Sequence, residues 1–198
     1  MNKGTAWFTS GRAGRVVGLA LVVGAIALGL SSQQETRAAG QPGGAVAVLR
    51  TVAGENAGVV AFAPRGEQVL VHATVWGLSP GFHGFHIHAV GACDPAMNFT
   101  SAGGHLNPEG DAHDDHAGDQ PSLLVLADGT GQLSFLTDRY TIADLVDADG
   151  ATVIVHALAD NFAHIPERYA SDGPDAMTLA TGDAGARIAC GLVTGPAP

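Results

Sequence analysis

Three of the nine histidines in this 198-residue chain fall within eight residues, from Gly81 to His88. Side chains alternate between the two faces of a β-strand, so His86 and His88 are expected on one face and Phe85 and Ile87 on the other. Two imidazoles about 7 Å apart along one strand face can bind the same metal ion. This stretch therefore predicts part of a metal site on a strand.

A segment without apolar periodicity follows, from residue 89 to 120, and such long loops are usually functional. It carries four further potential ligands, namely His105, His113, His116 and Asp119. Nitrogen and carboxylate ligands without sulfur suit zinc or copper. Solvated surface residues are the alternative, but four such residues beside a His-x-His strand favour a metal. His156, on an apolar strand, is either a neutral buried histidine or another ligand.

Short strands separated by turns must position these residues. Alternating apolar residues and turn signals predict strands at 45–50, 58–63, 68–76, 81–88, 122–126, 132–136, 151–158 and 187–193. Residues 141–146 fit a short helical turn or a strand. The predicted fold class is all-β: an eight-stranded flattened Greek-key β-barrel, or immunoglobulin-like sandwich, with long functional loops at 89–120 and 159–186.

The N-terminal residues have a different pattern. A basic stretch and an uncharged apolar run at 16–30 precede three small residues, Ala38-Ala39-Gly40. This pattern predicts a signal peptide over residues 1–40 and a domain over 41–198. The alternative is an uncleaved membrane anchor, although the run is short beside the about 20 residues that span a bilayer. We therefore expect an exported protein that is extracellular, periplasmic or in the cell envelope, and that meets a membrane only through an uncleaved N-terminal segment.

The predicted domain is strongly acidic. Residues 41–198 contain five arginines, no lysine and eighteen acidic residues, which gives a formal charge of −13, whereas the whole chain has −10. A domain of this charge is repelled by nucleic acid and by anionic lipid. Neither is an expected partner.

The chain has two cysteines, Cys93 and Cys190, and both follow the predicted signal peptide. An even cysteine count in an exported protein favours one disulfide, while two buried free thiols are the alternative. A disulfide would close a loop of almost a hundred residues, for which the chain-entropy model gives about 4–5 kcal/mol of stabilisation.

Several motifs occur together and in a fixed order along nearly the whole predicted domain. They are Gly81–His88, Ser101–Pro108, His116–Asp119, Val155–Asn161 and Thr181–Gly191. In these motifs the chain resembles the copper–zinc superoxide dismutase family, in its secreted bacterial type.

The resemblance implies two joined metal sites. Copper would be bound by His86, His88, His105 and His156. Zinc would be bound by His105, His113, His116 and Asp119, so that His105 bridges the two ions. The implied function is dismutation of superoxide to oxygen and hydrogen peroxide by a redox-cycling copper ion that is bridged through a histidine to a structural zinc.

The resemblance also implies roles for residues around the metals. Arg187 would attract the superoxide anion, and His105 would deliver a proton, so both are the expected catalytic residues. Asp160 would hydrogen-bond to ligands of both metals, and Thr181 would line the channel. A disulfide would tie the first long loop, at Cys93, to the last strand, at Cys190. Superoxide is the expected substrate, and the family includes monomers and homodimers.

Two features depart from the family. Only two residues separate His113 from His116, which predicts a tighter or weaker zinc site than usual. The second long loop together with Arg187 has a net charge of −3, so attraction of an anion would depend on that arginine. The competing hypotheses are a non-enzymatic protein that binds or delivers copper on the same fold, and a zinc-buffering or adhesive sandwich without redox activity.

Overall fold

A computed structural model describes residues 43–195 of the chain. The predicted signal peptide or anchor, at residues 1–40, lies outside the described residues. No helix within residues 43–195 is long and apolar enough to cross a membrane.

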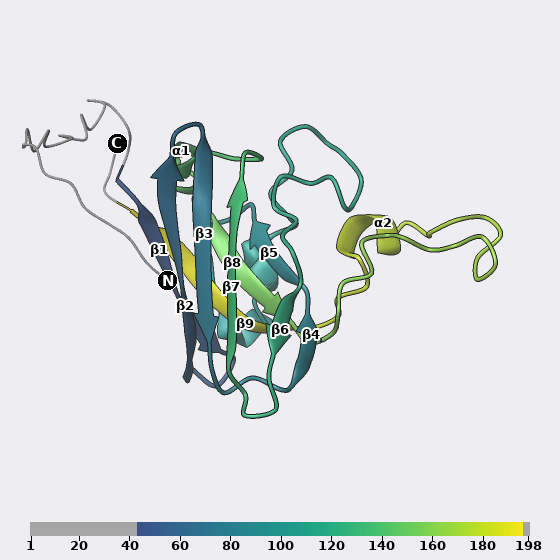
Figure 1. Ribbon diagram of the computed structural model, residues 1–198, viewed down its shortest axis with the longest axis horizontal. Helices are drawn as coiled ribbons and strands as arrows, with labels where there is room; N and C mark the ends of the chain where they lie inside the picture. Colours follow the sequence, from purple (N-terminus) through teal and green to yellow (C-terminus); the bar gives the residue numbers. More distant parts are fainter. Residues whose placement is uncertain (1–42, 196–198) are drawn as a thin grey trace, which may run out of the picture. The chain divides into compact units, whose positions relative to one another are not determined.

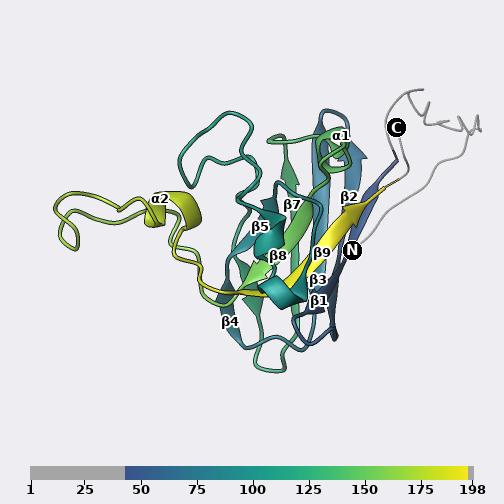
Figure 2. The same ribbon diagram turned by 180° about the vertical axis from the view of Figure 1, so that it is seen from behind.

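The described residues form nine strands that pair in an antiparallel manner (Figures 1 and 2). They are β1 (Ala45–Thr51), β2 (Asn56–Arg65), β3 (Gln68–Val75), β4 (Gly81–His83), β5 (Phe85–His88), β6 (Leu123–Val125), β7 (Gly131–Thr137), β8 (Thr152–His156) and β9 (Arg187–Thr194). Their order in the sheet is β4-β6-β7-β3-β2-β1-β9-β8-β5. β4 and β5 stand at the two ends of this order, yet only Gly84 separates them in the chain. The sheet must therefore curl into a nearly closed barrel. The predicted all-β barrel is confirmed.

The structure has nine strands where eight are predicted, because the histidine strand divides at Gly84. β4 pairs with β6, whereas β5 pairs with β8. At the switch, Gly84 N donates to Leu158 O (2.8 Å), and His156 N donates to Gly84 O (2.8 Å). The backbone of Gly84 thus holds the end of β8 beside the start of β5.

The ambiguous segment at 141–146 contains a short helix, α1 (Ile142–Leu145). Thr141 and Asp144 form a capping box: the Asp144 N–H donates to Thr141 Oγ1, and the Thr141 N–H donates to Asp144 Oδ2. This reciprocal capping satisfies backbone donors that a single helical turn leaves unpaired. The segment therefore is not a strand.

The barrel interior is filled by alternate residues of the strands. In β1, Ala45, Ala47 and Leu49 are buried in the core, and the residues between them are exposed. Phe85 and Ile87 of β5 point into the same core, and each such fully buried side chain contributes roughly 1.5–3 kcal/mol. The alternation that fixes these two side chains leaves the intervening histidines on the opposite face of β5.

Two long loops carry the remaining short helices. The first connects β5 to β6 and includes the 3₁₀ turns η1 (Pro95–Met97) and η2 (Thr100–Ala102). The second connects β8 to β9 and includes α2 (Thr178–Thr181), which lies out from the barrel in Figures 1 and 2. His113 N donates to Leu179 O (2.9 Å), so the two loops are joined by a backbone hydrogen bond.

Candidate metal centre

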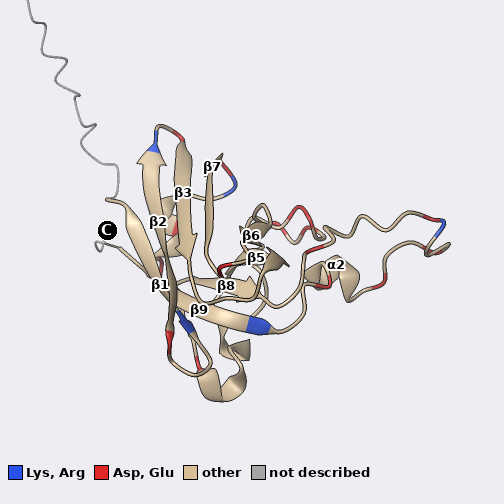
Figure 3. Cartoon of the chain, turned by 60° about the horizontal axis from the view of Figure 1, so that its bottom comes forward, with Lys and Arg blue, Asp and Glu red and all other residues tan. Residues whose placement is uncertain are grey.

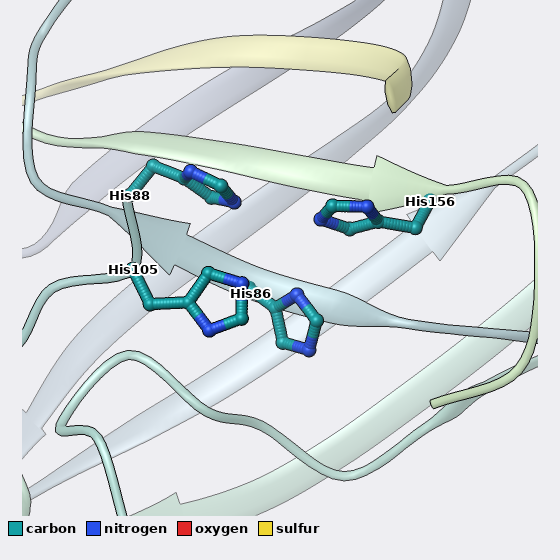
Figure 4. Close-up of side chains that lie close together, drawn as sticks. All are labelled: His86, His88, His105 and His156. Atoms are coloured by element: carbon teal, nitrogen blue, oxygen red, sulfur yellow. The ribbon is translucent and has the colours of Figure 1, made fainter. Parts of the chain in front are cut away.

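The first histidine cluster lies between β5, the first long loop and the end of β8 (Figure 4). It consists of His86, His88, His105 and His156, all of them buried. One ring nitrogen from each residue lies within 4.8 Å of the others. Residues from distant parts of the chain thus present four nitrogen atoms to one point.

Oxygen acceptors fix the orientation of three of these rings. His86 Nε2 bonds to Asp160 Oδ2 (2.7 Å), His88 Nδ1 to Gly103 O (3.0 Å) and His156 Nδ1 to Gly185 O (3.0 Å). The opposite nitrogens, His86 Nδ1, His88 Nε2 and His156 Nε2, are buried without a hydrogen-bond partner among the described residues. An unpaired buried nitrogen is costly, and this arrangement leaves three lone pairs for a cation.

The second cluster combines three histidines with one carboxylate. It consists of His105, His113, His116 and Asp119, whose ligand atoms also lie within 4.8 Å of one another. His105 Nδ1 lies 2.7 Å from Asp119 Oδ1, and His113 Nδ1 lies 3.0 Å from Asp119 Oδ2. A set of three imidazoles and one carboxylate suits a closed tetrahedral zinc site. His105 belongs to both clusters.

Asp160 connects the two clusters through its carboxylate. Oδ2 accepts a hydrogen bond from His86 Nε2 (2.7 Å), and Oδ1 accepts one from His113 Nε2 (2.8 Å). The Asp160 side chain is fully buried, and Phe162 N donates a further hydrogen bond to Oδ1 (2.7 Å). One carboxylate therefore orients a ring in each cluster.

Burial favours the uncharged form of three histidines of the first cluster. It lowers the pKa of His105 to about 4 and that of His156 to about 3, and it lowers the pKa of His88 well below its usual value. Neighbouring histidines add to these shifts. Neutral imidazoles are the form that binds a metal.

The second cluster favours positive charge at its centre. Burial alone would lower the pKa of His113, but hydrogen bonds and charge from Asp119 and Asp160 raise it to about 9. Burial by itself would raise the pKa of Asp119 and of Asp160. Hydrogen bonds and charge from their histidine partners nevertheless hold both pKa values well below the ordinary value of a carboxyl group. A cation is thus electrostatically favourable beside these two carboxylates.

A cavity of about 350 Å³ opens onto the first cluster. Its lining residues are His88, Gly104, His105, His156, Met177, Ala180, Thr181, Asp183, Gly185 and Arg187. Arg187 donates from Nη1 to Phe99 O and from Nη2 to Gly103 O, both at 2.6 Å. Partial burial lowers the pKa of Arg187, but a guanidinium keeps its charge. Acidic segments predominate along the loop that carries α2 (Figure 3).

The disulfide between Cys93 and Cys190 is present, with the two Cα atoms 5.8 Å apart. It joins the first long loop to β9, three residues after Arg187. Phe99 and Ala102 pack beside it in a small apolar cluster. The covalent bond thus holds the segment whose carbonyl oxygens anchor Arg187. Such disulfides are typical of proteins that reside in an oxidising compartment.

Two residues without a predicted role also shape the centre. Gly182 has φ +56°, and a Cβ atom there would overlap Asp160 Oδ1 and His113 Nε2. Only glycine permits this close approach. Arg139, which follows β7, donates from Nη1 to Asp114 O (2.9 Å) and to His116 O (3.1 Å). It therefore fastens the short segment between His113 and His116, although sequence spacing gave no signal for it.

Three histidines lie outside both clusters. His83 is buried, and its two ring nitrogens lie 2.7 Å from His156 O and 2.8 Å from Ser79 O. His72 and His164 are exposed. His83 therefore has a place in the scaffold between a turn and the end of β8.

Comparison with protein families gives a consistent result. A family model described as copper/zinc superoxide dismutase matches residues 56–193. "Superoxide dismutase [Cu-Zn]" of Mycolicibacterium paratuberculosis is 47% identical over 130 residues, which cover 59% of this chain and 57% of that protein. "Superoxide dismutase [Cu-Zn] 2" of Brassica juncea is 36% identical over 158 residues, or 76% of this chain and 97% of the relative. The chain spans little more than half the length of the mycobacterial relatives it matches.

Solved structures share the fold. The clock protein EA4 superposes with a TM-score of 0.62 at 26% identity, over 78% of this chain and 95% of that one. A superoxide-dismutase-like protein from Bacillus subtilis superposes with a TM-score of 0.60 at 30% identity, over 74% and 96% of the two chains. With the family match covering most of the described barrel, both loops and the two histidine clusters, the chain belongs to the copper/zinc superoxide dismutase family.

Proposed function

We propose that the protein dismutates superoxide to oxygen and hydrogen peroxide, with copper in the first cluster and zinc in the second. The observation that carries the proposal is the set of three buried ring nitrogens without hydrogen-bond partners among the described residues, which face the same point as His105. Nitrogen ligands of this number suit Cu(II). Bound copper would supply one-electron redox chemistry, and bound zinc a fixed positive charge.

The residues of the chain then have separate roles. Arg187, held by two carbonyl oxygens at the cavity wall, attracts the superoxide anion toward the first cluster. His105 contributes to both clusters, and its Nε2 holds and releases a proton for the peroxide product. Asp160 fixes the tautomers of His86 and His113, so that each ring keeps its other nitrogen free for a ligand bond. Thr181 lines the same cavity and leaves space for a small anion.

The disulfide supports an exported location, whether extracellular, periplasmic or in the cell envelope. Disulfides such as the one between the first long loop and β9 form and persist mainly in oxidising compartments. In that location the protein would act on superoxide that is present outside the cytosol.

The direct test combines metal content with turnover. The protein is loaded with copper and zinc, its metals are measured by elemental analysis, and decay of superoxide is followed after pulse radiolysis. We expect equal amounts of the two metals and catalysed decay that depends on copper. Copper binding without catalysis would instead favour the copper-delivery hypothesis, and zinc in both clusters without catalysis would favour the zinc-buffering hypothesis.

Arg139→Ala is expected to weaken zinc binding about tenfold, the lower end of the range that is typical when a group supporting metal ligands is removed. The substitution frees Asp114 O and His116 O, so the segment that carries two zinc ligands loses its anchor. Zinc affinity is measured by competition with a chromophoric chelator. Arg65→Ala is the matched control, since within residues 43–195 the Arg65 side chain donates only to the neighbouring Pro64 O. Equal zinc affinity in the two variants would contradict the role of Arg139.

A further inference from the structure

One sulfur-containing residue lines the cavity above the first cluster. Among its lining residues, Met177 alone carries sulfur, and it lines the same 350 Å³ space as His88 and His156. The chain has three methionines, and both cysteines are tied in the disulfide. Met177 therefore contributes a soft thioether group to the residues that line the same cavity as His88 and His156.

The backbone of Met177 is held by two hydrogen bonds, and the residue is largely exposed. Its N–H donates to Asp175 Oδ1 (3.0 Å), and its carbonyl oxygen accepts from Thr181 Oγ1 (2.9 Å). These bonds fix the residue at the N-terminal end of α2. Met177 is 64% exposed as a residue, and a methionine side chain has three rotatable bonds with which it can adapt to a ligand. The sulfur can thus meet an ion in solvent and remain at the cavity mouth.

The chemistry of the donor set selects one ion. Thioethers favour Cu(I), whereas zinc and other borderline or hard cations gain little from them. Imidazole nitrogens also bind copper, and His88 Nε2 and His156 Nε2 are buried without hydrogen-bond partners in the described structure. The thioether of Met177 and the buried nitrogens of His88 and His156 could therefore bind Cu(I) in succession, with one ligand replaced at a time.

We propose that the Met177 thioether is an entry ligand, which binds Cu(I) at the mouth of the cavity and passes it to His88 and His156. This inference rests on the proposed function, because it takes the first cluster to be the copper site. It adds Met177 as a transient ligand during the loading of copper. Because the thioether favours Cu(I), it would also reduce the entry of zinc into the first cluster.

Transfer kinetics test the proposal. Anaerobic apoprotein is mixed with the Cu(I)–bicinchoninate complex, and loss of its colour is followed. We expect Met177→Leu to accept copper about tenfold more slowly, the factor that corresponds to about 1.4 kcal/mol of additional activation free energy. Met97→Leu is the matched control, because Met97 lies in η1, is 53% exposed and does not line the cavity. Equal rates in the two variants would overturn the proposal.

Nuclear magnetic resonance gives a second readout that does not depend on activity. His156→Ala protein labelled with ¹³C in the methionine methyl groups is titrated with Ag(I), a redox-inert substitute for Cu(I). Because this variant lacks an inner ligand, the ion is expected to stay at the mouth and to shift the Met177 methyl signal but not that of Met97. A static Met177 signal, or equal shifts of both signals, would contradict the assignment.

The two proposals fail in different ways. If Met177 shifts and slows transfer but copper-loaded protein does not consume superoxide, the entry ligand stands and the proposed enzyme activity fails. If the loaded protein is active but Met177 neither shifts nor affects transfer, the enzyme activity stands and the entry ligand fails.

Discussion

Replacing His156 with alanine is expected to lower copper-dependent superoxide decay by at least about 100-fold, the upper range for loss of groups that only support a metal ligand. His156 Nε2 is one of three buried nitrogens that face the first cluster without a hydrogen-bond partner among the described residues. Alanine leaves a gap where a ligand was, and water fills it as a weaker ligand. Zinc binding should persist, because His156 is not part of the second cluster.

Elemental analysis and pulse radiolysis on the same sample measure both effects. His72→Ala is the control, since His72 is an exposed histidine on β3 outside both clusters. Circular dichroism establishes that each variant is folded. Unchanged copper content and rate in His156→Ala would refute the copper assignment, whereas equal losses in both variants would indicate a general effect of histidine removal.

Arg187→Ile is expected to slow the reaction about tenfold or more at low salt, within the range by which electrostatic steering raises association rates, an effect for which this enzyme family is an established example. Isoleucine removes the positive charge at the cavity wall and also the hydrogen bonds to Phe99 O and Gly103 O. The domain has no lysine to compensate, and the loop that carries α2 is acidic. The rate of the variant should also change little with ionic strength, since added salt has less attraction to screen.

Rates measured across a range of salt concentrations check this prediction. Arg168→Ile is matched in charge and in loop, but Arg168 lies over the Tyr169 ring, 4.8 Å from its centroid, and does not line the cavity. Its rate should be close to that of the unmodified protein. A similar decrease in both variants would mean that net charge matters and the position of Arg187 does not.

The sequence predicted the all-β barrel because alternation and turn signals are local patterns, whereas it predicted the members of the two histidine clusters partly from local patterns and partly from family resemblance. Alternation in β5 places His86 and His88 on one face without reference to the rest of the chain. The order of motifs then brought in His105 and His156 through family resemblance. The strand count was wrong by one, because the pairing switch at Gly84 depends on backbone partners in β8.

The residues that prediction missed act through contacts between distant segments. Nothing in the types or spacing around Gly182 indicates that Asp160 and His113 lie where a side chain would stand. Arg139 is 23 residues from His116, and its role depends on the turn after β7 reaching the first long loop. Met177 has no periodicity that would link it to histidines on β5 and β8. Such contacts are set by loop geometry, which sequence patterns describe poorly.

The shared carboxylate of Asp160 has a thermodynamic consequence. It bonds to one ring in each cluster, so a cation that tightens the hold of Asp160 on His113 also changes how well His86 is presented. Linkage requires this influence to be reciprocal: the factor by which zinc changes the affinity for copper equals the factor by which copper changes the affinity for zinc. Zinc in the second cluster would therefore be an allosteric effector of copper uptake, and copper an effector of zinc retention.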